Sequence, residues 1–325
     1  MVSYYNLHDT PNNRSSHEIP VPTLGGMSFF VALIFSLFSI NFFDSDGISF
    51  YLIISLIMIF LIGLKDDLSI ASPKSRLIVE LIAIGIILFH KDFTTINVAG
   101  FLGLYELSVF YTNILSVLVF ITIINAINLI DGVNGLAATI GIISFSVFAH
   151  IFLRVELYFY FYLCITLIAS LLAFLRYNFS PTKNIFMGDT GSLIIGFMIS
   201  FFSLKFLSID TVSFSSFKFI PENKMIIIGA IVSIPLFDLF RVFIVRLLNG
   251  KSPFVADRNH VHHILLDSGL PHYKVTLMLG FVNYAVIVIM MYLSSYFGSA
   301  LMLLLLAIMF ISYTIGLHYL KKSIS

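Results

Sequence analysis

The chain has 325 residues, of which 59% are hydrophobic and 11% are charged, and its mean hydropathy is +1.02. A soluble domain carries about 25% charged residues, so folding alone cannot keep this much apolar surface from water. The net charge of +1 excludes a bulk attraction to nucleic acid, and the single cysteine, Cys164, excludes an internal disulfide and a multi-cysteine metal site. The composition predicts an all-α, polytopic integral membrane protein.

A helix that crosses a bilayer needs about 20 apolar residues. The first 24 residues are polar and lack the apolar core of a signal peptide. We therefore expect a cytoplasmic N-terminal segment, 1–24, and a single transmembrane domain, 25–320. About ten transmembrane helices are predicted, of which the third is short enough to be interfacial instead. They span 25–43, 48–64, 77–89, 109–124, 136–153, 157–175, 193–207, 225–248, 275–293 and 299–318.

Ten spans place both chain ends on the same side of the membrane. Of the 18 lysines and arginines, thirteen then lie on the side of the chain ends and five on the other. Basic residues are enriched in cytoplasmic loops, so the side of the chain ends is predicted to be cytoplasmic. The five residues on the other side are Lys91, Arg154, Lys205, Lys218 and Lys224.

Four motifs with acidic residues each stand at the end of an apolar segment, and all four fall on the predicted cytoplasmic side. They occupy 65–67, 125–137, 186–192 and 257–263. A carboxylate at the edge of a membrane helix is costly, which makes a functional role the default interpretation. The four motifs predict one polar catalytic face.

The pair Asp66-Asp67 has two interpretations. Adjacent carboxylates at a helix end can hold a divalent cation, or one can accept a proton while the other holds the metal. The alternative is an ordinary solvated helix end.

Asp189 lies between Gly188 and Gly191, just before an apolar helix. Glycines let backbone approach a ligand closely, and a helix start offers N–H groups to phosphate. The alternative is that Asp189 only caps the helix. Phe186, in the same motif, would either pack in the protein or stack on a flat base.

Asn125, Asn128, Asp131 and Asn134 recur every three residues and would share one helix face, although the glycines among them are expected to break the helix. Amide side chains both donate and accept hydrogen bonds, as a base or a sugar demands. Polar contact between membrane helices is the alternative, mainly for Asn125.

A histidine cluster, His260, His262 and His263, follows Arg258. Three imidazoles could bind zinc, but a loop rich in Lys and Arg favours anion recognition. Carboxylates for Mg²⁺, cationic groups for phosphates and amides for a nucleotide together fit phosphoryl transfer. One substrate would be a soluble nucleotide derivative and the other a lipid.

These motifs resemble those of the polyprenyl-phosphate N-acetylhexosamine-1-phosphate transferases, the superfamily of MraY and WecA. Residues 9–17, with Pro20, Pro22 and Gly25-Gly26, look like the family's N-terminal motif, and the four motifs above look like its other signature blocks in the same order. The resemblance runs from about 9 to 267, roughly four fifths of the chain.

The resemblance implies transfer of a sugar 1-phosphate from a UDP-sugar to polyprenyl (undecaprenyl) phosphate, with release of UMP and with Mg²⁺ or Mn²⁺ as cofactor. It places the reaction at the cytoplasmic face of the bacterial inner membrane, in cell-envelope glycan biosynthesis, and leaves a homodimer open. The catalytic residues that it implies are Asp66, Asp67, Asp131 and Asp189, with Asp66, Asp67 and Asp189 as metal ligands.

By the same resemblance Phe186 would stack on uracil, and the histidine cluster with Arg258 would hold the sugar and diphosphate. The pattern His260-Val-His-His is closer to the WecA-like branch, whose donor is usually UDP-GlcNAc, than to the muramoyl-pentapeptide branch. The other substrate-binding candidates are Arg76, Asn125, Asn128, Asn134 and Asn178.

The chain departs from the family pattern at three places. Asn134 stands where bacterial members usually have a second aspartate, and an amide is neither a base nor a strong metal ligand, so we assign Asn134 to nucleotide recognition. Thr23 stands where many WecA-like members have arginine, which removes one phosphate contact. Eight residues precede Asp9, where WecA-like members have a membrane helix, so the chain is either a ten-span variant or lacks an upstream helix.

Three alternatives stay open. The donor could be another UDP-N-acetylhexosamine, such as UDP-N-acetylfucosamine or UDP-N-acetylquinovosamine. A secondary transporter would place its charges near the membrane midplane between internal repeats, and no repeat is evident here. A zinc hydrolase built on the histidine cluster is the weakest alternative.

Overall fold

The computed structural model describes residues 8–9, 21–69, 71–94, 96–214, 218–252 and 259–324. Arg258 and most of the predicted N-terminal motif lie outside these residues. The α-helices of the described part are α1 (Gly26–Ser39), α2 (Ile48–Ser69), α3 (Pro73–Leu88), α4 (Val109–Ile130), α5 (Leu136–Arg154), α6 (Tyr158–Asn178), α7 (Gly188–Ser208), α8 (Lys224–Ile231), α9 (Ser233–Leu248), α10 (Val261–Asp267), α11 (His272–Leu293) and α12 (Ser299–Ile324).

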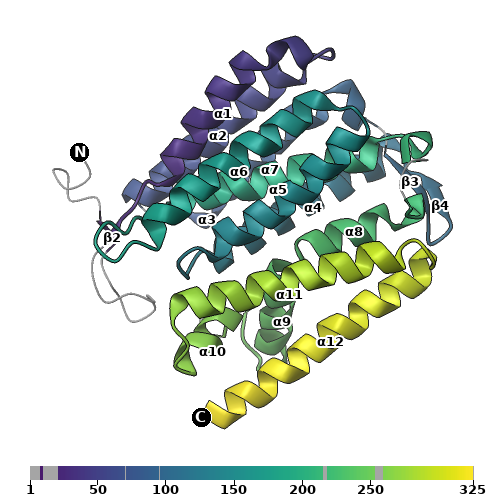
Figure 1. Cartoon of the computed structure of the whole chain (residues 1–325). Helices are drawn as coiled ribbons and strands as arrows, with labels where there is room; N and C mark the ends of the chain where they lie inside the picture. The colour runs from purple at the N-terminus through teal and green to yellow at the C-terminus, as the bar shows by residue number, and fades with distance from the viewer. Residues whose placement is uncertain are drawn as a thin grey trace.

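Short elements complete the fold. The part of the chain that the structure describes contains two antiparallel strand pairs, β1 (His8–Asp9) with β2 (Val21–Pro22) and β3 (Asn97–Phe101) with β4 (Leu104–Glu106). The β3–β4 hairpin lies at one end of the helix bundle, and β2 and α10 lie at the other (Figure 1). Short 3₁₀ helices occupy Asn41–Phe43, Lys91–Phe93, Thr211–Phe214 and Pro221–Asn223.

The centre of the bundle is α7, whose residues from Thr190 to Leu207 are buried. It packs against α2, α4, α1 and α5. Small residues allow the close approach: a Cβ added to Gly196 would lie 2.7 Å from the Cα of Ile124, and one added to Gly26 would lie 2.1 Å from the nitrogen of Gly191. Glycines thus set the start of α7 tightly against its neighbours.

The structure confirms an all-α, multi-pass membrane protein. Among the described residues, seven helices are long and apolar enough to cross a membrane, and an eighth span is formed if α8 and α9 are counted together. The remaining two predicted spans contain α1, with 14 residues, and α3, with 16, both shorter than the roughly 20 that a full crossing needs.

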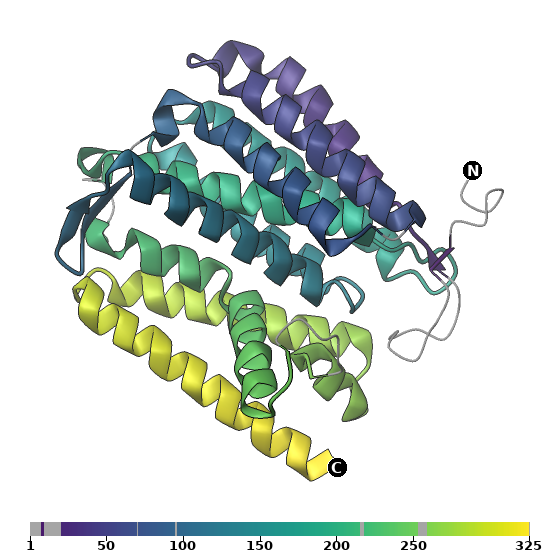
Figure 2. The same cartoon turned by 180° about the vertical axis from the view of Figure 1, so that it is seen from behind.

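The predicted span 225–248 consists of two helices, α8 and α9, with a bend of 72° between them. Pro235 has no N–H, and its ring clashes with the carbonyl of a residue four positions earlier, here Ile231, in a straight helix. Asn283 of α11 occupies the break: its amide donates to the Ile231 carbonyl (3.0 Å) and accepts from the backbone of Ile234 (3.1 Å) and the Ser233 hydroxyl (3.1 Å). As a result α9 runs across α11 and α12 instead of along them (Figure 2).

Candidate active site

Asp67, in the last turn of α2, caps the first turn of α7. Its Oδ1 accepts from the backbone nitrogen of Asp189 (2.7 Å), and its Oδ2 accepts from the nitrogen (3.0 Å) and the hydroxyl (2.5 Å) of Thr190. Gly188 has φ +72°, and a Cβ there would lie 2.6 Å from Asp67 Oδ1, so the turn needs glycine. The expectation that these N–H groups bind phosphate is therefore wrong: they donate to Asp67.

The Asp189 side chain is held by two residues of other helices. Asn128 of α4 donates from Nδ2 to Asp189 Oδ1 (2.5 Å) and to the Ser192 hydroxyl (2.9 Å). Arg76 of α3 places its Nη1 3.7 Å from the same Asp189 oxygen and donates from it to Asn128 Oδ1 (3.2 Å). Glu80, buried one turn further along α3, accepts from Arg76 Nε (3.0 Å) and orients the guanidinium. The buried Arg76 Nη2 has no hydrogen-bond partner in the described part of the chain.

Asp66 and Asp131 complete an acidic group around Asp189. Asp66 Oδ1 accepts a hydrogen bond from the backbone nitrogen of Ala71 (2.6 Å) at the α2–α3 turn. Asp66 Oδ2 lies 3.8 Å from Arg76 Nη1. Asp131 follows the end of α4, and its burial, together with the nearby carboxylates of Asp189 and Asp67, raises the pKa of Asp131 well above the usual range. Carboxylates that repel each other in this way are hard oxygen ligands suited to a divalent cation.

The predicted metal site is not preformed in the described part of the chain. No three of its His, Cys, Asp or Glu side chains are already spaced to hold a metal ion. Both carboxylate oxygens of Asp67 already accept hydrogen bonds from the first turn of α7. Asp189 and Asp66 are therefore favoured over Asp67 as metal ligands. The chemistry of these oxygen donors fits Mg²⁺ or Mn²⁺.

The histidine cluster reaches the loop after α4. A Cβ on Gly132 would lie 2.8 Å from His262 Nε2, so the loop that carries Asp131 lies directly against this ring. The rings of His262 and His263 have centroids 4.2 Å apart. Burial, and then the neighbouring His263, lower the pKa of His262 to about 3, so this ring is neutral at physiological pH. The structure brings His262 against Gly132, the residue after Asp131, so the fourth motif lies beside the second.

The other predicted residues take more varied positions. Asn134 lies three residues beyond Asp131, donates from its backbone to His272 Nδ1 (3.4 Å) and accepts from Thr276 (2.7 Å). Its side chain lines an open pocket of 510 Å³ with residues of α11 and with Phe179. Because of its size and aromatic walls, this pocket beside Asn134 is compatible with a flat ligand.

Three other predicted residues, Asn125, Asn178 and Phe186, form hydrogen bonds outside the acidic group. Asn125 donates to the Ile121 carbonyl (2.7 Å) of its own helix, and Asn178 donates to the Ile185 carbonyl (2.7 Å), which fixes the loop before α7. Phe186 accepts from the Gly25 nitrogen (2.9 Å) through its backbone. Their roles in substrate binding stay predictions, and Arg258 lies outside the described residues.

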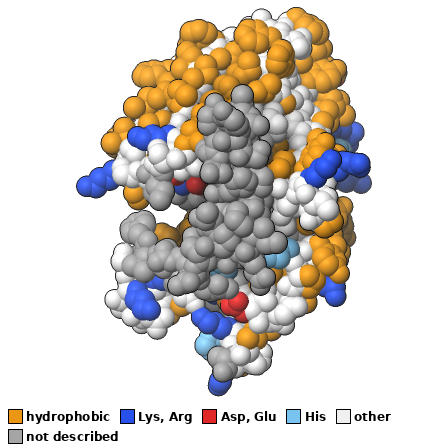
Figure 3. All heavy atoms as spheres, turned by 90° about the vertical axis from the view of Figure 1, so that its left-hand side faces the viewer, with side chains coloured by type: hydrophobic (Ala, Val, Ile, Leu, Met, Phe, Trp, Pro, Cys, Tyr) orange, Lys and Arg blue, Asp and Glu red, His pale blue; other side chains and the backbone are white. Residues whose placement is uncertain are grey.

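Several residues that hold the site were not predicted. Thr190 and Ser192 stand inside a recognised motif, and Glu80 and Asp238 are carboxylates within apolar segments, which is itself a signal of function. Asp238 accepts from His260 Nδ1 (2.8 Å). The end of the molecule that carries the site is seen in Figure 3, with Lys and Arg side chains around its rim and acidic and histidine side chains between them.

An acidic group with one guanidinium and a histidine cluster, at one end of a membrane-embedded helix bundle, defines an integral membrane enzyme suited to phosphate-containing substrates. The sequence matches the family model described as glycosyl transferase family 4 over residues 49–207. It is 33% identical over 265 residues to a Bacillus subtilis (strain 168) protein named as a probable undecaprenyl-phosphate N-acetylglucosaminyl 1-phosphate transferase, covering 81% of this chain and 71% of that one.

Two further relatives are similar over about the same share of the chain, at lower identity. The undecaprenyl-phosphate alpha-N-acetylglucosaminyl 1-phosphate transferase of Escherichia coli (strain K12) is 28% identical over 271 residues, 81% of this chain and 70% of its own. The decaprenyl-phosphate N-acetylglucosaminephosphotransferase of Mycobacterium leprae (strain TN) is 28% identical over 297 residues, with 83% and 72% covered. The chain belongs to glycosyl transferase family 4, together with these polyprenyl-phosphate sugar-phosphate transferases.

Proposed function

We propose that the protein transfers N-acetylglucosamine 1-phosphate from UDP-GlcNAc to a polyprenyl phosphate and releases UMP. The observation that carries the proposal is the position of Asp66 and Asp189 on either side of Arg76, with Asp131 close to Asp189, at the end of the helix bundle. The names of the relatives point to N-acetylglucosamine as the sugar. The excess of basic residues on this side supports a cytoplasmic active site in the inner membrane of a bacterium.

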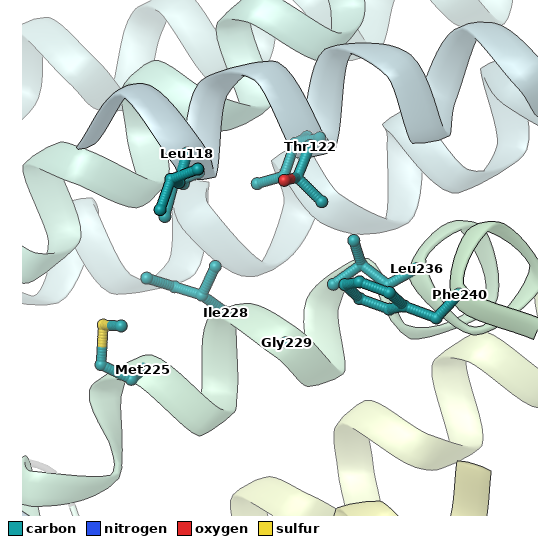
Figure 4. A pocket seen from close by; sticks show the side chains of 9 residues that line it. Leu118, Thr122, Met225, Ile228, Gly229, Leu236 and Phe240 are labelled. Carbon is teal, nitrogen blue, oxygen red and sulfur yellow. The ribbon is translucent and has the colours of Figure 1, made fainter. Parts of the chain in front are cut away.

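The acceptor lipid would lie in an apolar groove on α4. A pocket of 220 Å³ opens between α4, α8 and α9 (Figure 4), and apolar side chains make up most of its wall. The bend between α8 and α9 shapes it, because Leu236 and Phe240 of α9 close the end beside Thr122 and Ile123 of α4. Further along α4 comes Asn128, so a prenyl chain in the groove would direct its phosphate toward Asp189 and Arg76.

The donor diphosphate would be bound by cationic and neutral donors and not by the helix start. Arg76 is held by Glu80 and Asn128, and its Nη2 is left for a substrate oxygen. A phosphate oxygen of the acceptor attacks the phosphorus that bears the sugar, the bond from this phosphorus to the bridging oxygen breaks, and UMP leaves. Arg76 offsets the negative charge that spreads over the phosphoryl oxygens.

The acidic residues would accept a proton and bind the metal ion. Asp67 fixes the Asp189 backbone and accepts three hydrogen bonds, which leaves Asp66 or Asp131 as the better proton acceptor. Asp189 and Asp66 would hold Mg²⁺ or Mn²⁺, which supplies positive charge next to the diphosphate. The soluble substrate and the lipid are thus the expected partners of this site, with the bilayer around it.

Label transfer from a panel of UDP-sugars tests the proposal. Membranes that contain the protein should pass label from UDP-GlcNAc into the lipid extract and release UMP, and a chelator should stop the reaction. Asp189→Asn should lower the rate about 100-fold or more while the protein stays folded.

The matched control is Asp92→Asn, which removes a carboxylate at the other end of the bundle, where Asp92 pairs with Lys205 (2.6 Å). It should transfer label at nearly the normal rate. If label enters the lipid only from UDP-N-acetylfucosamine or UDP-N-acetylquinovosamine, that UDP-sugar is the donor and UDP-GlcNAc is not. Uptake of a solute without formation of a labelled lipid would favour a transporter.

A further inference from the structure

We infer that Asp238 is a positioning residue of the transferase, which sets the histidine cluster at the donor site through His260. Asp238 lies in α9 and is 1% exposed, so it does not touch a substrate. Its Oδ2 accepts from His260 Nδ1 (2.8 Å), and its Oδ1 accepts from the backbone nitrogen of Val261 (2.8 Å) and from Arg241 Nη2 (2.8 Å). The inference rests on the proposed function, because it assigns the cluster to the donor.

The three hydrogen-bond donors to Asp238 are what a buried carboxylate requires. Burial of an unpaired charge is so unfavourable that a charged side chain inside a protein is paired and hydrogen-bonded. Of the three donors, two belong to the start of α10, and only Arg241 belongs to α9 itself. Asp238 is therefore committed to α10, and its loss would release the first turn of the helix that carries His262 and His263.

The bend between α8 and α9 positions Asp238 beside the start of α10. Asp238 stands six residues after Val232, about 9 Å along the helix axis, so a 72° change of direction moves it by several ångströms from a straight path. Asn283 holds the bend at the other end, as described above. The broken helix thus has a second use besides the groove: it presents Asp238 to the histidine cluster.

A second set of bonds fixes the residue before His260. Arg241 Nη2 also donates to the Asn259 carbonyl, and Lys321, near the end of α12, donates to Asn259 Oδ1. Phe237 of α9 packs on the rings of Phe310 (5.5 Å between centroids) and Tyr313 of α12. The start of α10 is consequently held between α9 and α12.

The hydrogen bond also determines which His260 nitrogen faces the site. The bond from Nδ1 to Asp238 fixes the orientation of the ring and leaves Nε2 as the nitrogen that Asp238 does not engage. The His260 ring lies parallel to that of His262, with 10° between the planes and centroids 5.8 Å apart. His262 in turn lies against Gly132, next to Asp131. An error in the His260 orientation would therefore pass along the row of rings to the donor site.

Steady-state kinetics with UDP-GlcNAc and polyprenyl phosphate test the inference. Asp238→Asn should raise KM for UDP-GlcNAc by about 10- to 100-fold, with little change in KM for the lipid, because misplacement of the cluster weakens donor binding only. Asp238→Asn combined with His260→Gln should be no worse than His260→Gln alone, because Asp238 acts through His260. Effects that multiply in the double variant, or an unchanged donor KM in folded Asp238→Asn, would overturn the inference.

Two further measurements separate positioning from general stability. Asp92→Asn again serves as the control: it removes a largely buried ion pair far from the histidine cluster, so it should lower thermal stability and leave the donor KM unchanged. Asp238→Glu keeps the charge but lengthens the side chain, and it should raise the donor KM less than Asp238→Asn. If Asp238→Asn does not fold, an unchanged donor KM in Asp238→Glu would count against the inference.

Amide hydrogen exchange, measured without substrate, distinguishes a failure of the inference from a failure of the proposed function. Asp238→Asn should speed exchange at Val261 and the next residues of α10, whichever sugar the enzyme uses. Faster exchange, with wild-type protein that does not transfer N-acetylglucosamine phosphate, would reject the proposed donor alone. Unchanged exchange in α10 would reject the positioning role.

Discussion

Two adjacent carboxylates, Asp66 and Asp67, have different surroundings although the sequence gives them the same context. Successive residues on a helix point about 100° apart, so one side chain reaches α7 and the other faces the α2–α3 turn and Arg76. The sequence predicted that the pair is functional but not how its two members differ. That difference depends on which helices lie beside α2, and sequence spacing does not contain it.

Gly188 gives the first prediction. Gly188→Ala should lower both stability and activity, because an alanine at φ +72° is strained by about 1 kcal/mol and its Cβ would displace the Asp67 carboxylate. Thermal unfolding and transferase rate would be measured on the purified variant. Gly85→Ala is the control: Gly85 lies inside α3 with nothing within 4 Å of an added Cβ, so that change should stabilise the protein slightly. Equal effects of the two substitutions would contradict the capping role of Asp67.

Asn134 and Asp131 should respond differently to truncation. If Asn134 reads the uracil base, Asn134→Ala should raise KM for the nucleotide sugar through loss of one or two hydrogen bonds of about 0.5–1.5 kcal/mol each. Asp131→Ala should instead lower kcat, because its carboxylate belongs to the acidic group around Asp189. Asn134→Asp should be tolerated. Loss of turnover with an unchanged KM in Asn134→Ala would reverse the division of roles.

His262 makes the stability depend on pH. Its pKa is about 3 in the folded protein, against 6.5 for an ordinary histidine, so between these values the unfolded chain binds a proton that the folded protein does not. The stability linked to His262 is therefore complete above pH 6.5 and falls with decreasing pH, by up to about 1.4 kcal/mol per pH unit. His262→Gln should lose less thermal stability than wild type between pH 7.5 and 5. A larger loss in the variant would contradict a buried, neutral His262.

At the scale of helices, the apolar runs located the elements but not all their ends. The run in α4 stops at Ile124, yet the helix continues to Ile130, because Asn125 bonds to its own helix and Asn128 to Asp189 and both stay helical. The start of α7 lies at Gly188 instead of at the predicted 193, since its cap, Asp67, comes from another helix. Long-range partners of this kind cannot be inferred from a local pattern.

The break between α8 and α9 could have been predicted from Pro235, but not its direction or its partner. Asn283→Leu should destabilise the protein by about 1–3 kcal/mol, because the Ile234 N–H would be buried without a partner and the Ile231 carbonyl would keep only the longer bond from the Ser144 hydroxyl (3.5 Å). Thr314→Val is the control, since Thr314 bonds only to a carbonyl of its own helix. Thermal unfolding in detergent compares the two variants. A destabilisation no larger than that of Thr314→Val would show that the break does not depend on Asn283.

At the scale of the whole molecule, the sequence predicted that the four motifs meet at one face, and the described residues confirm this for three of them directly. Asp67, Asp131 and Asp189 come together, and His262 of the fourth reaches Gly132. The positive-inside pattern and the order of the spans were sufficient to predict that the motifs share one face. The pairing of Asn128 with Asp189, and of Asp238 with His260, depended on packing in three dimensions.

The side of the membrane on which this face lies is a prediction that cysteine labelling checks. The asymmetry of thirteen basic residues against five predicts that the face is cytoplasmic. Cysteines introduced at Ser72, Ser180 or Ser252 should react only with reagent on the cytoplasmic side, and cysteines at Ser45 or Ser213 only from outside. The native Cys164 is buried, so it should give little background.

Topology and catalysis are linked in this experiment. Ser72 stands at the start of α3, one turn before Arg76, so its accessibility reports directly on the side of the active site. A soluble UDP-sugar made in the cytoplasm can be used only if this side is cytoplasmic. Labelling of the Ser72 and Ser252 positions from opposite sides would contradict the single polar face. Labelling of both from outside would keep the face but remove the access of a cytoplasmic donor, and with it the proposed direction of the reaction.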